Sequence, residues 1–116
     1  VSGGFEPIVK VVAVNLGFDR YVCNKAEITN GRLTGKVVKP IVDANTKLNV
    51  LKQEAKQLAI TLEQTCTVGD GANDLPMLQA ACIGVAYNGK PLVRAGTPYQ
   101  INSSSLSSIL LIMGIT

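Results

Sequence analysis

The sequence contains no histidine and no tryptophan, and only five of its 116 residues are aromatic (three Tyr and two Phe). The lack of histidine excludes acid–base catalysis by an imidazole and zinc sites with histidine ligands. The longest apolar run, residues 109–113, is far too short to span a bilayer, so no membrane partner is expected. The net charge is +3, but the Lys and Arg residues are scattered and form no stripe with aromatic residues, so a nucleic-acid-binding surface is not expected either.

The sequence contains only three cysteines, and their spacing does not suggest a metal-binding or redox motif. Cys23, Cys66 and Cys82 form no Cys-x-x-Cys motif, stand in apolar contexts, and follow no secretory segment. This usage predicts reduced, buried thiols in a cytoplasmic protein. The hydrophobic content of 47% is enough for one core, and the chain is expected to be a single domain or part of one. It opens at Val1 without an initiator Met, as if at the end of a strand, so we expect a fragment of a longer protein.

The first half of the chain predicts a helix and a hairpin. Pro7 and Gly17 frame a helix over residues 8–16, although most of its residues are β-branched. A short strand is expected at residues 21–23. Asn30-Gly31 is the strongest short signal for a β-hairpin, with residues 26–29 and 32–35 as its strands, and residues 37–42 are expected to be extended.

The second half alternates strands with helices. A helix is expected over residues 43–60, with one apolar face that comprises Leu48, Leu51, Ala55, Leu58 and Ala59. The elements expected after it are a strand at 65–68, a helix at 73–81, a strand at 83–87, a helical turn at Lys90-Pro91, an edge strand at 99–101, and a helix capped by Ser103 that runs to 112. This alternation predicts an α/β fold with a doubly wound, Rossmann-like parallel sheet.

The stretch of residues 65–78 carries the clearest chemical signal. A β-branched strand is followed by Gly69 and Gly71, which let the backbone turn, and by Asp70 and Asp74 where a helix begins. Parallel sheets bind ligands at such strand ends, and two carboxylates placed there favour a hard divalent cation, Mg²⁺ above all. The alternative interpretation is that the two acids only cap the helix and complement its dipole.

Residues 69–78, Gly-Asp-Gly-Ala-Asn-Asp-Leu-Pro-Met-Leu, resemble the fourth motif of the haloacid dehalogenase phosphatase superfamily, in the wording of its phosphoserine phosphatase family. The resemblance implies that Asp70 is a direct Mg²⁺ ligand. It also implies that Asn73 donates a hydrogen bond to phosphate or orients Lys47, and that Asp74 holds metal-bound water or that lysine. Residues 84–93 resemble the same family.

Two further stretches agree with this resemblance. Residues 2–5, Ser-Gly-Gly-Phe, resemble the second motif, in which Ser2 and Gly3 would cradle phosphate oxygens; taken alone, they are a turn. Lys47 resembles the third motif and would neutralise the phosphoryl group. As a cation in the first turn of a helix it lies at the unfavourable end of the dipole, which calls for an anion nearby, either Asp43 or a bound phosphate.

The reaction of this family proceeds through an aspartyl-phosphate and needs an Asp-x-Asp motif, which this sequence lacks. The resemblance therefore implies that residues 1–116 are a partial catalytic domain with a three-layer α/β sheet. The strand with the nucleophile and the cap domain are absent from it. We expect the isolated chain to be inactive, and the missing piece to come from residues outside this sequence, from another chain or from a homodimer.

The leading hypothesis is a Mg²⁺-dependent phosphoserine phosphatase, a serine-biosynthesis enzyme that releases L-serine and phosphate. The first alternative is a non-catalytic domain that binds Mg²⁺ and phosphate, or only a partner protein. A less favoured alternative is the phosphorylation domain of a P-type ATPase, which shares a Gly-Asp-Gly-x-Asn-Asp string. Val68 and Leu75-Pro76 depart from that family's pattern around the string.

Overall fold

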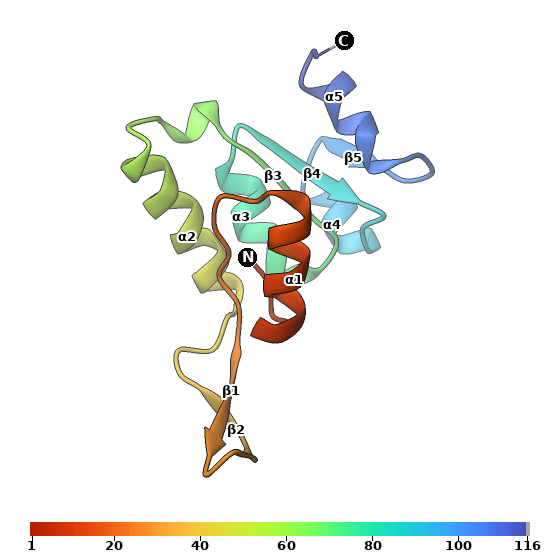
Figure 1. Cartoon of the computed structure of the whole chain (residues 1–116). Helices are drawn as coiled ribbons and strands as arrows, with labels where there is room; N and C mark the ends of the chain where they lie inside the picture. The colour runs from red at the N-terminus through yellow and green to blue at the C-terminus, as the bar shows by residue number, and fades with distance from the viewer. Residues whose placement is uncertain (116) are drawn as a thin grey trace. The chain divides into compact units, whose positions relative to one another are not determined.

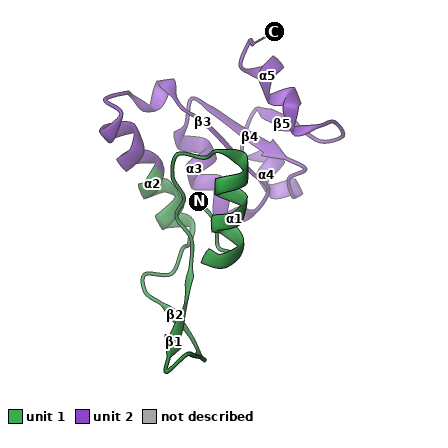
Figure 2. Ribbon diagram, viewed as in Figure 1, with its two compact units in different colours: residues 1–50 green, residues 51–116 purple. Residues whose placement is uncertain are grey.

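The computed structural model describes residues 1–115, which divide into two compact units (Figures 1 and 2). Unit 1 comprises residues 1–50, and unit 2 begins at Leu51. Among residues 1–115, no helix combines the length and the apolar character needed to cross a membrane.

Helix α1 (Glu6–Leu16) in unit 1 forms where proline and glycine frame it, as predicted. Pro7 lies in its first turn, where a missing backbone N–H costs nothing. Gly17 takes a left-handed conformation at φ 72°, and its N–H closes the last turn on the carbonyls of Ala13 and Val14. Framing residues thus outweigh the weak helix propensity of the β-branched residues between them.

The predicted hairpin is confirmed, with strands β1 (Lys25–Thr29) and β2 (Arg32–Val38) paired antiparallel. Asn30 and Gly31 form its turn with φ of 51° and 74°, the left-handed pair that this tight turn requires. The strand predicted at residues 21–23 is wrong. In that segment the Val22 carbonyl accepts the Ser2 N–H at 2.9 Å, and the next residue, Asn24, forms only an isolated bridge with Phe5.

Helix α2 (Ala44–Gln57) begins at Asp43, whose Oδ1 accepts the Thr46 N–H at 2.9 Å. The helix ends earlier than predicted, because Ala59 turns into the left-handed region at φ 54°. Leu58, expected on the buried face, is therefore 67% exposed, and that part of the predicted face is wrong.

Unit 2 is an α/β unit built on a parallel sheet of β3 (Cys66–Gly69), β4 (Ile83–Tyr87) and β5 (Tyr99–Ile101), in that order. The connecting helices are α3 (Leu75–Ala80), preceded by the 3₁₀ turn η2 (Ala72–Asp74), and α4 (Pro91–Ala95). Its core comprises Leu51, Met77, Leu78, Ala86 and Val93. The predicted α/β class, the strands predicted at 65–68 and 83–87 and the edge strand at 99–101 are confirmed.

The last elements differ from the prediction in detail. After the turn η3 (Leu106–Ser108), helix α5 is short (Ile109–Ile112). The capping side chain is Ser105, which accepts the Ser107 N–H at 3.2 Å, and not Ser103. The thiols are free, but Cys82 is exposed, so the prediction that all the thiols are buried is wrong.

Candidate functional site

The loop after β3 is held by the carboxylate of Asp74. Asp74 is 4% exposed, and its Oδ2 accepts the N–H groups of Asp70 and Gly71, each at 3.1 Å. On the other side of the loop, the N–H of Lys90 donates to the Asp70 carbonyl at 3.2 Å. The backbone of Asp70 is thus fixed from two directions, while its own side chain is exposed at the carboxyl end of the sheet. The 3₁₀ turn η2 presents Asn73, also exposed, beside it.

Gly69 makes this arrangement possible. A Cβ at position 69 would lie 2.4 Å from the Cβ of Asp74 and 2.6 Å from its Oδ2. Only a residue without a side chain lets the Asp74 carboxylate reach the loop amides. The Gly-Asp-Gly-x-Asn-Asp string is therefore explained locally as a strand end, an anchor and two exposed polar side chains.

In unit 1, residues 2–4 form a tight turn. The Ser2 Oγ accepts the Gly4 N–H at 2.9 Å, and the Ser2 N–H donates to the carbonyl of Val22 at 2.9 Å. Gly3 and Gly4 are exposed, and a Cβ at Gly3 would meet nothing within 4 Å. The turn therefore offers a hydroxyl and glycine amides next to open space.

Asn24 is a residue that the sequence analysis missed. It is buried, its Nδ2 donates to the Gly3 carbonyl at 3.0 Å, and its Oδ1 accepts the Val42 N–H at 2.8 Å. One amide side chain thus joins the Ser2–Gly4 turn to the segment from which α2 starts. Its only signal in the sequence is a polar residue directly after an apolar run.

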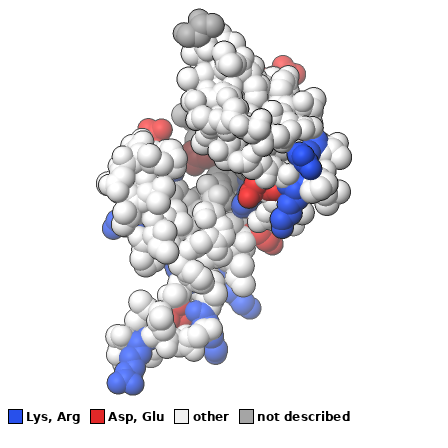
Figure 3. Space-filling view, turned by 90° about the vertical axis from the view of Figure 1, so that its right-hand side faces the viewer, with Lys and Arg blue, Asp and Glu red and all other residues white. Residues whose placement is uncertain are grey.

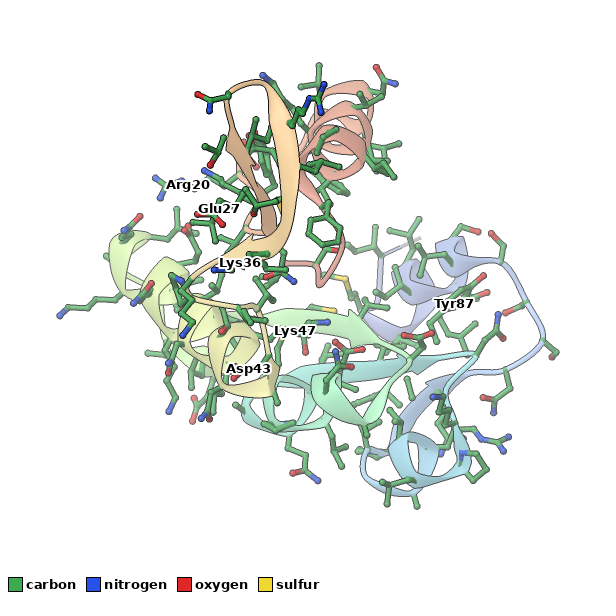
Figure 4. All side chains as sticks on the ribbon, turned by 90° about the horizontal axis from the view of Figure 1, so that it is seen from below. Arg20, Glu27, Lys36, Asp43, Lys47 and Tyr87 are labelled. Carbon is green, nitrogen blue, oxygen red and sulfur yellow. The ribbon has the colours of Figure 1, made fainter. Side chains whose placement is uncertain are left out.

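Lys47 lies in the first turn of α2 and is 8% exposed, so it is not the solvated lysine that an isolated Lys would be (Figure 4). Asp43, one of the two anions expected to compensate it, accepts hydrogen bonds from the N–H and the hydroxyl of Thr46. These hydrogen bonds, first that from the backbone and then that from the side chain, lower the pKa of the Asp43 carboxyl.

The candidate residues fall into two groups. Ser2, Gly3 and Lys47 belong to unit 1. Asp70, Asn73 and Asp74 belong to unit 2. Within unit 2 the structure brings its three residues into one loop, and within unit 1 Asn24 connects the turn with the start of α2. In residues 1–115, no three His, Cys, Asp or Glu side chains gather as a metal cage.

The profile of the haloacid dehalogenase-like hydrolases matches residues 1–79. The chain belongs to this family. Its full length is 43% identical to a part of the phosphoserine phosphatase SerB2 of Mycobacterium tuberculosis that makes up 28% of that protein. Over 110 residues, 95% of the chain, it is 43% identical to the phosphoserine phosphatase of Lactococcus lactis and covers 51% of it.

A solved structure of a substrate-bound phosphoserine phosphatase superposes on the whole chain with a TM-score of 0.88 at 34% identity, and the chain covers 54% of it. The α/β fold of this haloacid dehalogenase-like chain, with its parallel sheet and hairpin, is thus that of phosphatases in the family. The chain spans about a quarter to a half of the length of the relatives named here.

Proposed function

We propose that these residues form the phosphate- and metal-binding part of a Mg²⁺-dependent phosphoserine phosphatase. The observation that carries the proposal is the loop after β3, in which Asp74 fixes the backbone and leaves Asp70 and Asn73 exposed at the carboxyl end of a parallel sheet. Identity to phosphoserine phosphatases over nearly the whole chain supports the substrate class.

The donor set of the loop fits Mg²⁺. This ion keeps several waters and is usually bound through one or two carboxylates together with substrate phosphate, so a cage of three acids is not required. In our proposal Asp70 is the direct ligand. Asp74 acts by holding the loop amides, and the oxygen that accepts them is not available as a ligand. When bound, the ion would neutralise charge on the phosphoryl oxygens.

In our proposal the phosphate contacts come from Ser2, Gly3, Lys47 and Asn73. A hydroxyl that accepts one hydrogen bond, as Ser2 does from Gly4, can still donate its proton to a phosphoryl oxygen. Gly3 would add a backbone N–H, Asn73 a side-chain amide and Lys47 an ammonium group. Each contact places a hydrogen-bond donor or a positive charge against the phosphoryl oxygens, over which the negative charge is spread in the transition state of phosphoryl transfer.

The nucleophile lies outside these residues. None of the four aspartates, Asp19, Asp43, Asp70 and Asp74, stands in an Asp-x-Asp motif after an apolar strand. We therefore expect a polypeptide of these 116 residues to bind phosphate without hydrolysing phosphoserine. The Asp-x-Asp segment would come from further residues of the same protein or from another chain.

The second candidate function is a non-catalytic domain that binds Mg²⁺ and phosphate, and the same missing motif favours it. Sequencing the reading frame upstream of Val1 distinguishes the two. An Asp-x-Asp motif after an apolar strand supports the enzyme, and its absence supports the binding domain.

The binding part of the proposal can be tested on the 116-residue chain. Titration with inorganic phosphate in the presence of Mg²⁺, followed by amide NMR shifts, should be saturable. Lys47→Gln should weaken phosphate binding about tenfold or more, because a hydrogen bond to a charged group contributes about 1.5–3 kcal/mol. Lys52→Gln, on the exposed side of the same helix, is the matched control.

Asp70→Asn should weaken Mg²⁺ binding by a similar factor, with the exposed Asp19→Asn as its control. Equal Mg²⁺ affinity in the Asp70 and Asp19 variants would refute the metal assignment. Turnover of phosphoserine by the unmodified chain would refute the assignment of the nucleophile to other residues.

A further inference from the structure

Unit 1 contains an apolar hollow of about 390 Å³ on one face of the hairpin. Its lining combines the start of α1 with both hairpin strands and comprises Phe5, Pro7, Ala26, Leu33, Gly35, Lys36 and Val37. The volume lies in the range of protein pockets that bind ligands, about 300–1,000 Å³.

Strand pairing explains why the hollow exists. Ala26 pairs with Val37, and Ile28 pairs with Leu33, so these four side chains lie on the same face of the hairpin. Between the two pairs the register is irregular, and Gly35 occupies the gap with φ 84°. A Cβ at Gly35 would meet nothing within 4 Å, so the space beside this glycine is open.

The apolar face around the hollow is uncovered. Leu33 is 72% exposed and Ile28 is 64% exposed. A two-stranded hairpin is marginal by itself, and among residues 1–115 no third strand pairs with it. Exposed apolar side chains around a preformed hollow are typical of a surface that another segment covers.

Charge indicates what kind of segment fits. Residues 25–39 carry four basic side chains, Lys25, Arg32, Lys36 and Lys39, against the single acid Glu27, a net charge of 4 − 1 = +3. All four basic residues are exposed, and Figure 3 shows Lys and Arg side chains predominating on the hairpin. Glu27 accepts the Thr34 hydroxyl at 2.7 Å, and Lys25 pairs with Glu6 at 3.3 Å. A second copy would bring the same positive charge against this surface.

We propose that this hollow is a docking site for a peptide segment of a partner protein that carries one apolar side chain flanked by carboxylates. The apolar side chain enters between Phe5, Leu33 and Val37, and the carboxylates lie near Lys36 and Arg32 (Figure 4 labels Lys36). Specificity would come from the hollow, and faster association from the charges.

The test is a fluorescence-anisotropy titration of the 116-residue chain with a labelled synthetic peptide, one leucine between glutamates, without Mg²⁺ or phosphoserine. Binding should be saturable and weaken with salt. It should fall at least about tenfold for peptides with serine in place of leucine, because burial of a leucine side chain contributes on this scale. It should also fall for peptides with lysine in place of glutamate, because like charges would then face each other.

Ala26→Phe fills the hollow and should weaken binding about tenfold or more. Thr29→Phe adds the same ring on the opposite face of β1 and should not. Lys36→Glu should weaken binding, whereas Lys52→Glu on α2 should not. Amide NMR spectra of each variant show whether the hairpin is intact. If Ala26→Phe disturbs the hairpin, the comparison of Lys36→Glu with Lys52→Glu still tests the proposal.

Three results would overturn the proposal. The first is absence of saturable binding, and the second is equal binding of the acidic and basic peptides. The third is a dimer, detected by sedimentation of the chain alone, that Ala26→Phe dissociates, since the occupant would then be a second copy. None of these results depends on the phosphatase assignment, because no phosphate or metal is present.

Discussion

Gly69→Ala tests the explanation of the loop that presents Asp70. The added Cβ would lie 2.4–2.6 Å from three atoms of the Asp74 side chain, which is far closer than such atoms approach in proteins. Asp74 cannot swing away at low cost, because it is buried and its Oδ2 accepts two backbone N–H groups. The backbone must shift, or these hydrogen bonds must break.

Overpacking of this kind typically costs about 1–3 kcal/mol, and leaving a buried hydrogen-bonding group unsatisfied costs a similar amount. Replacing glycine also restricts the unfolded chain, which offsets about 0.4–1 kcal/mol. We therefore expect Gly69→Ala to lower the free energy of unfolding of unit 2 by about 1–3 kcal/mol. Urea denaturation, followed by the amide signals of β3 and β4, measures the change.

The matched control is Gly3→Ala, since a Cβ at Gly3 meets nothing within 4 Å and its φ is not in the left-handed region. It should change stability by no more than about 0.5 kcal/mol. Gly84→Ala should be more damaging than Gly69→Ala, because its Cβ would meet the backbone carbonyl of Leu78 at 2.0 Å. If Gly69→Ala is as stable as Gly3→Ala, the account of Asp74 as the anchor of the loop is incorrect.

Three further predictions concern other residues. Asn24→Ala should destabilise unit 1 by about 1–3 kcal/mol in urea, because the Val42 N–H loses its acceptor. The pKa of Asp43 is lowered in the folded chain, so the carboxylate should stabilise the fold fully above pH 3.8, and this stabilisation should be lost as the pH falls through the folded pKa. In an acid titration of stability, the Asp43→Asn variant should not show this loss. Iodoacetamide should modify Cys82 before Cys66 in mass spectra, because Cys82 is exposed, whereas burial and then the charge of Cys82 raise the pKa of the Cys66 thiol.

The sequence predicted those elements whose ends carry residues that favour a particular backbone conformation. Pro7 with Gly17 and Asn30 with Gly31 each restrict the backbone, so the helix and the hairpin formed where expected. The strands at 66–69 and 83–87 were likewise predictable, because short apolar runs that end at a glycine-containing turn suit a buried sheet.

The predictions that were wrong concern elements whose ends depend on contacts with residues distant in sequence. Nothing local in residues 21–23 shows that their backbone would pair too little to form a strand, and nothing local shows that α2 would end at Gln57. The capping serine was misplaced within a run of similar residues, of which Ser105 has the required geometry. Asn24 was missed for the same reason, since its role depends on Gly3 and Val42, both distant in sequence.

The sequence indicated that the motif around Asp70 places two carboxylates at a strand end, but it did not predict which backbone groups they contact. The string suggested that Asp70 and Asp74 share a cation, whereas the structure shows that Asp74 binds the amides of Asp70 and Gly71. The Asp74 carboxylate thus holds the loop backbone, whereas Asp70 is exposed. Four-residue spacing alone does not distinguish two exposed carboxylates from one exposed carboxylate and one that holds the loop.

Our proposal assigns Ser2, Lys47, Asn73 and Asp70 to the same phosphate and its metal ion. Mn²⁺, added in place of Mg²⁺ with inorganic phosphate, broadens the NMR signals of amides close to the bound ion. The account predicts simultaneous broadening of residues 2–4, Lys47 and residues 70–74, and its loss in Asp70→Asn. Broadening confined to residues 70–74, with residues 2–4 and Lys47 unaffected, would contradict a single shared site.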